Sequence, residues 1–311
     1  MKPEFNNNAW QEFCKLYKLQ IPSFQHANYY LEVLGRCPGY AWIPQRLFEF
    51  QDLVSKLRAQ DQTPTDYKFK QMQGLVEWFK QSPALKALEG VRRPADVSEF
   101  DKLHSATPDQ ICASIDLKQA NYNTWRRFDQ TLPSTWEELM LQQQVHPAIG
   151  NSKSFRQIVF GNLNPKRLQQ AQAAETYKIK LLMESEATQA IRWSADEVTF
   201  AVHRSHVSKF SDDYTSKVDK NPEILPSRLV FYELQPIPEL GSRQTFYRFN
   251  SNGVLVANHS ELFGVPGNLM YLALKEHILH EPVQMEDLLF RMEGRNAYWD
   301  HPMLHQASHK T

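Results

Sequence analysis

The sequence has little cysteine and no long hydrophobic run. Three cysteines, Cys14, Cys37 and Cys112, stand far apart in 311 residues, and none belongs to a CxxC pair. This spacing encodes neither a disulfide framework nor a thiolate zinc site. No run of about 18 uncharged apolar residues occurs, and the N-terminus has no apolar signal-peptide core. We therefore expect a soluble, cytoplasmic protein that does not associate with membranes.

An excess of charge of one sign is also missing. Lysine plus arginine and aspartate plus glutamate each total 35, so the formal net charge is zero. Electrostatic affinity for nucleic acid or anionic lipid grows with the number of phosphates that a protein neutralises. The balance excludes attachment by net charge alone and leaves only a local basic groove as a route to nucleic acid.

The common catalytic signatures are absent from the sequence. There is no GxxxxGK[ST] phosphate loop, no GxGxxG fingerprint, no GxSxG elbow, no HExxH zinc motif and no DxDxDG calcium loop. No repeat of 20 to 50 residues is visible either, which excludes solenoids and propellers. The sequence therefore leaves the cofactor unknown and points to no common enzyme class.

The composition is that of a folded chain, with 41% hydrophobic, 12% aromatic and 23% charged residues. A chain of 311 residues exceeds the length of about 250 to 300 residues at which single cores stop growing. We expect an α+β protein with two domains. Residues 1–147 should form a helical domain, and residues 148–311 a mixed α+β domain with a small antiparallel sheet.

Helix-start signals punctuate the first 147 residues. Thr63 supplies a cap hydroxyl, Pro64 occupies the first helical position, and Asp66 places an acid in the first turn. Together these signals predict a helix over 64–81. Residues 8–19 and 24–35 show helical spacing of apolar residues as well. The apolar residues along one side of the 64–81 helix are Phe69, Met72, Val76 and Phe79.

Two more segments carry the same kind of start signal. Residues 107–110 (TPDQ) repeat the cap pattern, and residues 134–137 (STWE) read as a capping box between Ser134 and Glu137. We therefore expect mostly helix before residue 147. All strands should lie between about residues 155 and 260, with boundaries accurate to about two to four residues.

The pattern changes after Gly150. Residues 166–189 are rich in helix formers, which predicts a long helix that bridges the two parts. Residues 227–236 read as a strand, and a hairpin is expected from 246–250 and 254–258 around a Ser-Asn-Gly turn. The remaining expectations are an exposed loop or lid at 208–226 and helices at 267–280 and 284–292.

Histidines recur at helical spacing in three places. The pairs are His203 with His206 and His277 with His280, and His301, His305 and His309 follow at intervals of four. Spacing of three or four puts imidazoles on one helix face, where two can ligate one metal. Zinc-protease motifs place an acid between the two histidines, whereas Glu281 follows His280. We expect solvated histidines and no metal site.

Residues 295–301 read RNAYWDH. Arg295 and His301 in this stretch resemble the R-x(4–6)-H element of HEPN-type ribonucleases. The resemblance implies a catalytic pair that positions and protonates groups around a scissile phosphate, on a long helix of a four-helix bundle. Gly294 and Pro302 flank the stretch and depart from such a helix. The alternative is a C-terminal segment anchored by its two aromatic residues.

A carboxylate in the expected strand at 227–236 offers a weaker metal-dependent alternative. Glu233, with Asp212 or Asp213 upstream, is loosely similar to the E-x-K or E-x-Q strand of restriction-type nucleases. Two carboxylates that hold magnesium beside a phosphodiester would be sound chemistry. A glutamate that faces solvent at the end of a strand is the reading that we favour.

Basic residues interleave with aromatics and turns in three segments. The candidate nucleic-acid-binding residues are Arg92 and Arg93, then Trp125, Arg126 and Arg127, then Lys166 and Arg167. Guanidinium groups make bidentate phosphate contacts, and an exposed tryptophan can stack on a base. Taken separately, each segment also fits a solvated helix face with Trp125 turned into the core. A groove that joins Arg92, Arg126 and Lys166 would favour nucleic acid.

These observations lead to three alternatives. The leading hypothesis is a cytoplasmic accessory protein that binds DNA, RNA or a nucleoprotein partner through the basic segments. The second is a phosphodiester hydrolase that works through Arg295 and His301 or through a metal. The third is a protein-interaction subunit of a larger complex, which the neutral charge balance favours.

Overall fold

The structure is a computed structural model. It describes residues 7–19, 27–37, 40–92, 98–185, 188–236, 244–249, 262–263, 275, 279–292 and 295–298. Within these ranges the protein is α+β, with helices before and around one antiparallel sheet. None of the described helices is both long and apolar enough to span a membrane.

Seven strands form one antiparallel sheet in the order β1-β3-β4-β2-β5-β6-β7. The strands are β1 (Phe100–Asp101), β2 (Gln110–Leu117), β3 (Gln189–Trp193), β4 (Glu197–His203), β5 (Ser227–Pro236), β6 (Gln244–Phe249) and β7 (Leu262–Phe263). Strand β2 is central, because it pairs with β4 on one side and with β5 on the other. The expected strand at 227–236 is confirmed.

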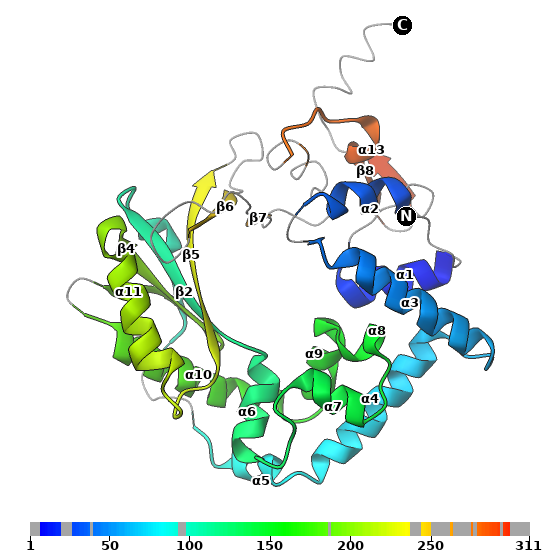
Figure 1. Ribbon diagram of the computed structural model, residues 1–311, viewed down its shortest axis with the longest axis horizontal. Helices are drawn as coiled ribbons and strands as arrows, with labels where there is room; N and C mark the ends of the chain where they lie inside the picture. Colours follow the sequence, from blue (N-terminus) through cyan, green and yellow to red (C-terminus); the bar gives the residue numbers. More distant parts are fainter. Residues whose placement is uncertain are drawn as a thin grey trace, which may run out of the picture.

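Four of these strands and two helices make a β-α-β-β-α-β unit. After β2 the chain reaches α10 (Pro165–Met183), returns through β3 and β4, and passes through α11 (Val207–Tyr214) into β5. Both helices pack on the same face of the sheet (Figure 1). Their apolar contacts with the strands include Ile179 and Phe210, which are buried against Ile115 and Phe200. The opposite face carries a smaller apolar cluster around Cys112, Ala201 and Tyr232.

The helical part of the chain surrounds a core of stacked aromatic rings. Its helices are α1 (Asn7–Tyr17), α2 (Ala27–Gly35), α3 (Ile43–Arg58), α4 (Pro64–Lys80), α5 (Pro83–Glu89), α6 (Ala120–Phe128), α7 (Trp136–Gln142), α8 (Pro147–Gly150) and α9 (Lys153–Gly161). Phe79 lies 5.4 Å from Trp125 and 5.2 Å from Phe160 between ring centroids. Such tilted contacts add to the free energy gained by burying the rings.

Helix α10 belongs to both cores. Leu168 and Ala171 lie in the helical core, whereas Ile179 and Met183 lie in the core beneath the sheet. The prediction that the helix after residue 165 bridges the two parts is therefore confirmed. The helix ends at Met183, a few residues earlier than expected.

A buried ion pair attaches a C-terminal segment to α2. Lys275 and Asp287 are 3% and 1% exposed, and their side chains approach to 3.1 Å. Tyr29 donates a hydrogen bond of 2.8 Å to Asp287 and accepts one of 2.8 Å from Lys275. The hydroxyl of Tyr29 thus helps to satisfy both charges, which buried ions require. Beyond it follow α13 (Met285–Leu288), β8 (Leu289–Met292) and β9 (Arg295–Tyr298).

The expectation that all strands lie between residues 155 and 260 is wrong. Strands β1 and β2 precede residue 147, and β8 and β9 follow residue 260. The cap-like signal at 107–110 leads into β2 rather than a helix, because residues 111–115 form a continuous buried run that two neighbouring strands cover. The boundary at 147–148 stays a prediction, but the sheet takes strands from both sides of it.

Other local expectations also differ from the structure. Residues 207–219 are not a loop but α11 followed by one π-helical turn, η4 (Thr215–Asp219), because Phe210, Tyr214 and Val218 recur every four residues and are buried. The capping box of α7 joins Thr135 and Glu138, one residue later than expected. The predicted helix at 284–292 is α13 followed by β8. Residues 250–258 and 267–274 lie outside the described residues.

Helix α4 allows a matched test of the helical core. Phe79→Ala should lower the free energy of unfolding by about 3–5 kcal/mol, because it removes a fully buried ring and leaves a cavity. Phe69 was expected on the buried side of the same helix, but 57% of it is exposed. Phe69→Ala should therefore stay within about 0.5 kcal/mol. Denaturant unfolding of both variants checks this, and equal losses would contradict the packing described.

Candidate functional site

Two adjoining hollows open beside the N-terminal half of α6, and together they form the basic cleft. Their volumes are about 640 and 770 Å³, and they share Asn123, Arg126 and Pro226. The charged side chains that line the first hollow are Lys118, Arg126, Lys153, Arg156, Arg228, Asp116 and Asp196. Five basic and two acidic groups give it a net charge of +3, although the whole chain is neutral.

Backbone hydrogen bonds fix the floor of this hollow at the end of β2. The Leu117 amide donates to the carbonyl of Asp196 (2.9 Å), and the Lys118 amide donates to that of Pro226 (2.8 Å). Gln119 then adopts φ 45°, the left-handed region that is uncommon outside glycine, and starts α6. The carbonyl of Lys118 accepts a hydrogen bond from the Asn123 side chain. The turn from strand to helix is therefore tied to two other strands.

Arg126 brings an unpaired cation into the cleft. Its Nε is buried and has no hydrogen-bond partner among the described residues. A buried donor without a partner costs about 1–3 kcal/mol, and more when the group is charged. The neighbouring Trp125 anchors this part of α6 in the core, since it is 0% exposed and donates to Ser82 at 3.0 Å. The buried ring of Trp125 thus fixes this turn of α6, and the fixed turn places Arg126 in the lining of the cleft.

Arg156 on α9 is the second cation without a described ion pair. Burial lowers the pKa of its guanidinium, and the nearby charge of Glu137 offsets only part of that effect. Glu137 itself accepts two hydrogen bonds of 2.9 Å from Gln119. The positive charge of Arg156 therefore has no close partner within the part of the chain that the structure describes.

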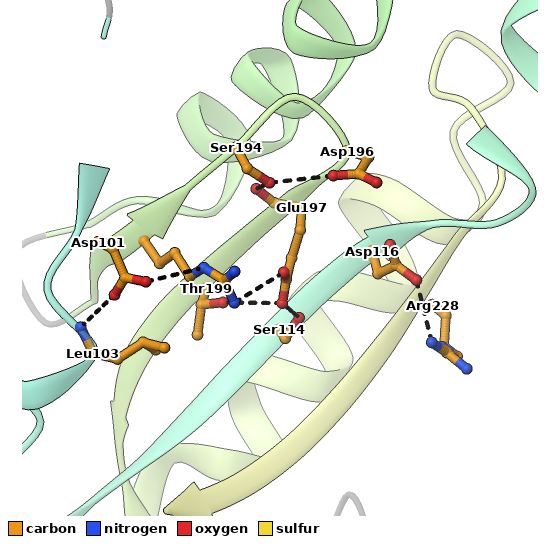
Figure 2. A network of polar contacts seen from close by, with 10 residues as sticks. Asp101, Leu103, Ser114, Asp116, Ser194, Asp196, Glu197, Thr199 and Arg228 are labelled. Carbon is orange, nitrogen blue, oxygen red and sulfur yellow. Dashed lines mark hydrogen bonds and ion pairs between the residues drawn. The ribbon is translucent and has the colours of Figure 1, made fainter. Parts of the chain in front are cut away.

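Two aspartates lie in the same hollow. Asp116 is the last residue but one of β2, and Asp196 lies in the three-residue turn between β3 and β4 (Figure 2). Burial raises the pKa of the Asp116 carboxyl, and the charges of Asp196 and Glu197 add to this, whereas Arg228 and Lys153 oppose it. Asp116 also accepts a 3.2 Å hydrogen bond from Arg228. Perturbed carboxyls in clefts are typical of functional sites.

Glu197 follows Asp196 in the sequence and lies opposite Asp116 in the pairing of β2 with β4, but it serves a different purpose. Figure 2 shows its carboxylate within a network on β2, β3 and β4, where it accepts a hydrogen bond of 2.5 Å from Ser114. Arg192 bridges Glu197 and Asp101 at 3.2 and 3.5 Å. With Asp101 on β1, this network links four strands, and it leaves Asp116 and Asp196 as the carboxylates of the hollow.

The structure separates the basic residues that the sequence suggested into two groups. Arg126 and Arg127 line the cleft, whereas Arg92, Lys166 and Arg167 are not part of its lining. Arg167 donates to the carbonyl of Val91 at 3.2 Å, so the segments around Arg92 and α10 do meet. Arg92 itself is exposed and bonds to nearby carbonyls. Arg93 lies outside the described residues.

Two members of the central segment differ from the expected roles. Trp125 is completely buried and cannot stack on a base, so its proposed part in binding is wrong. Arg127 lies 2.6 Å from Glu175, a residue that is almost fully buried, so its charge is already paired. Of this segment, Arg126 is the cation that remains unpaired among the described residues.

The helix implied by the HEPN resemblance is contradicted at Arg295. Residues Arg295–Tyr298 form strand β9, which pairs antiparallel with β8. A strand alternates side chains between faces and cannot present the R-x(4–6)-H spacing as a helix would. His301 lies outside the described residues, so its place relative to Arg295 is not part of the structure.

The histidine and strand-carboxylate candidates show other arrangements. His203 lies 2.6 Å from the Ser205 hydroxyl and 3.4 Å from Asp109, but this exposed group caps a short turn, η3 (Arg204–His206). Glu233 pairs with Arg204 at 2.5 Å. The described residues contain no group of three or more histidine, cysteine or acidic side chains placed to hold a metal. His277 lies outside them, and His280 is exposed.

The sequence interpretation missed Asp116, Asp196, Lys153 and Arg156. One signal was available, because the β-rich segments 189–193 and 197–203 flank Ser194-Ala195-Asp196, a short hairpin turn that ends in an acid. Asp116 likewise follows the apolar run 111–115. Their meeting in one cleft depends on the pairing of β2 with β4, which no local pattern specifies.

The raised pKa of Asp116 predicts an unusual pH dependence of stability. Because the folded protein binds this proton more tightly than the unfolded chain, ionisation of Asp116 costs stability once the pH exceeds its ordinary pKa of 3.8. Asp116→Asn should therefore raise the free energy of unfolding at pH 7, and the gain should vanish on acidification.

Asp213 is the matched control for Asp116. Its pKa is lowered, first by a hydrogen bond from Lys209, so its ionised form is favoured by folding. Asp213→Asn should slightly reduce stability at pH 7 and have no effect at low pH. Denaturant unfolding at several pH values measures both variants. A loss of stability in Asp116→Asn at pH 7 would show that the pair with Arg228 outweighs burial.

Comparison with known proteins gives no relative. No known protein family, curated protein or solved structure matches this chain. The function is therefore inferred from the chemistry of the basic cleft and from the strands and helices that form it.

Proposed function

We propose that this chain is a cytoplasmic protein that binds nucleic acid through the basic cleft. The observation that carries the proposal is the unpaired guanidinium of Arg126, which the core holds against the cleft with its Nε buried and without a partner. Nucleic-acid phosphates accept bidentate hydrogen bonds from guanidinium groups. A bound phosphate would supply the missing acceptor.

The distribution of charge supports the same ligand. Lys118, Lys153, Arg156 and Lys220 line the two hollows and form no ion pair within the described ranges. Together with Arg126 they concentrate unpaired positive charge in a concave surface, where field lines are focused. Binding through this cleft agrees with the neutral chain, because it needs a local patch of charge and no net excess.

The two hollows adjoin, and their combined volume exceeds what a single small anion needs. They meet at Asn123 and Arg126, and the second hollow continues along Lys220 and Asn221 to the start of β5. Polar amides in the lining can contact sugars and phosphates without reading sequence. We therefore favour binding that depends on the backbone of the nucleic acid and little on its bases.

The cysteines are in keeping with a cytoplasmic protein. Cys14, Cys37 and Cys112 are buried as free thiols, and burial raises the pKa of Cys37 to about 11 and that of Cys112 to about 12. Thiols of this kind stay protonated at neutral pH and react slowly. Because these three cysteines form no disulfide, the fold does not depend on an oxidising compartment.

Substitution in the cleft tests the proposal. Arg126→Gln and Arg156→Gln should each lower affinity for a labelled oligonucleotide at about 50 mM salt, and each should reduce the salt slope by about one unit per lost contact. Arg58→Gln is the charge-matched control, because Arg58 is exposed at the end of α3 and outside the cleft. Fluorescence anisotropy with single-stranded and duplex DNA and RNA gives both quantities.

Unaltered circular dichroism would show that the variants fold. If none of these nucleic acids binds the native protein at low salt, the proposal fails, and interaction with another protein subunit becomes the better account. Equal losses in Arg58→Gln and Arg126→Gln would contradict the placement of the site and indicate binding by diffuse charge.

A further inference from the structure

The pair Asp116 and Asp196 is unexplained by nucleic-acid binding alone. Carboxylates repel phosphates, yet these two lie among the five basic side chains of the first hollow, next to the strand-to-helix turn that the backbone fixes. Neither aspartate is needed to bind a strand of nucleic acid, so the pair calls for a second ligand in the same hollow.

The two aspartates come from adjacent strands of the central sheet. Asp116 lies opposite Glu197 in the pairing of β2 with β4, and Asp196 is the residue before Glu197. The 2.9 Å hydrogen bond from the Leu117 amide to the Asp196 carbonyl joins the two backbones directly. A sheet is a rigid support, so the backbone positions of the two aspartates are set before any ligand arrives.

We propose that Asp116 and Asp196 bind a divalent cation together with the phosphates of a nucleoside triphosphate, so that the basic cleft is a nucleotidyl-transfer site. This inference rests on the proposed function, because the acceptor is the nucleic-acid strand in the same cleft. Magnesium is usually bound by one or two carboxylates plus substrate phosphates and water, so it does not need a cage of three protein ligands.

The charges of the first hollow favour a triphosphate over a strand phosphate at this position. A divalent cation neutralises the two carboxylates and leaves the five basic groups, Lys118, Arg126, Lys153, Arg156 and Arg228. A nucleoside triphosphate brings about four negative charges close together, whereas a strand brings one per phosphate. The concentration of five cations in one hollow therefore fits the triphosphate better.

Arg228 pairs with one of the two carboxylates. Its guanidinium lies 3.2 Å from Asp116, so this pair has to open or shift when a cation binds Asp116. Arg228 is more than half exposed, so it can move aside toward the phosphates when the cation binds. Breaking this exposed pair costs little, since such pairs are worth about 0–1 kcal/mol.

The second hollow provides room for the acceptor strand. It shares Arg126 with the first hollow, and its other charged lining residues are Arg127, Lys220, Asp219 and Glu223. A terminal hydroxyl of the strand would attack the α-phosphorus in line, forming the new P–O bond as the bond to the β-phosphate oxygen breaks. Pyrophosphate leaves, and the hydroxyl proton passes to solvent. The cation stabilises the charge on the phosphates during this displacement.

The test uses the full chain, manganese or magnesium, a nucleoside triphosphate mixture and a labelled oligonucleotide with a free 3′ hydroxyl. Calorimetry should show that triphosphate binding needs the divalent cation and weakens at least tenfold in Asp116→Asn and in Asp196→Asn. Asp212→Asn is the matched control, because Asp212 is exposed on α11 and outside the cleft. Gel electrophoresis should show extension of the oligonucleotide by the native protein.

The outcomes distinguish this inference from the proposed function. Oligonucleotide binding should survive or strengthen in Asp116→Asn, since a negative charge leaves the cleft, whereas it weakens in Arg126→Gln. Triphosphate binding that is equally strong with EDTA, or unchanged in both aspartate variants, would overturn the metal site. Cleavage of the oligonucleotide without extension, or no reaction despite cation-dependent binding, would overturn nucleotidyl transfer.

Discussion

Helix α10 passes through both hydrophobic cores, and the relative placement of the helical part and the sheet depends on it. Its first turns pack with the aromatic core around Phe79 and Phe160, and its last turns pack beneath β4. In Figure 1 it lies beside α6 at the junction of the two parts. A single rigid helix shared by two cores restricts hinge motion between them, because a change of angle would expose apolar surface on one side or the other.

The middle of α10 shows how the junction is held at the cleft. Gln172 donates to Asn121 at 2.8 Å, Glu175 pairs with Arg127, and Thr176 accepts a hydrogen bond from Trp193. All three α10 residues are buried. Their hydrogen bonds and ion pair therefore hold α6 and β3 against α10, away from solvent. The same arrangement places the N-terminal half of α6 over the end of β2. The basic cleft is thus a consequence of how the two cores are joined.

Local signals predicted local structure well, and they failed where distant strands decide it. Thr63, Pro64 and Asp66 start α4 as expected, because a cap is completed within four residues. The similar signal at 107–110 starts a strand, because β4 and β5 cover the run that follows. For the site, the sequence named Arg126 and Trp125 together as binding candidates and left open that Trp125 lies in the core, where the structure places it. It could not identify Asp116 with Asp196, since the two lie 80 positions apart in the sequence with five helices, α6 to α10, between them.

The proposals above share one premise, that the basic cleft and its two aspartates handle phosphates at a defined point of a chain without net charge. The most direct test is a crystal structure of the protein with manganese and a non-hydrolysable nucleoside triphosphate, with anomalous scattering used to locate the metal. The account predicts a manganese peak between the carboxylates of Asp116 and Asp196, with the triphosphate against Arg126 and Arg156. Nucleotide bound elsewhere, or a cleft without manganese at saturating concentration, would contradict it.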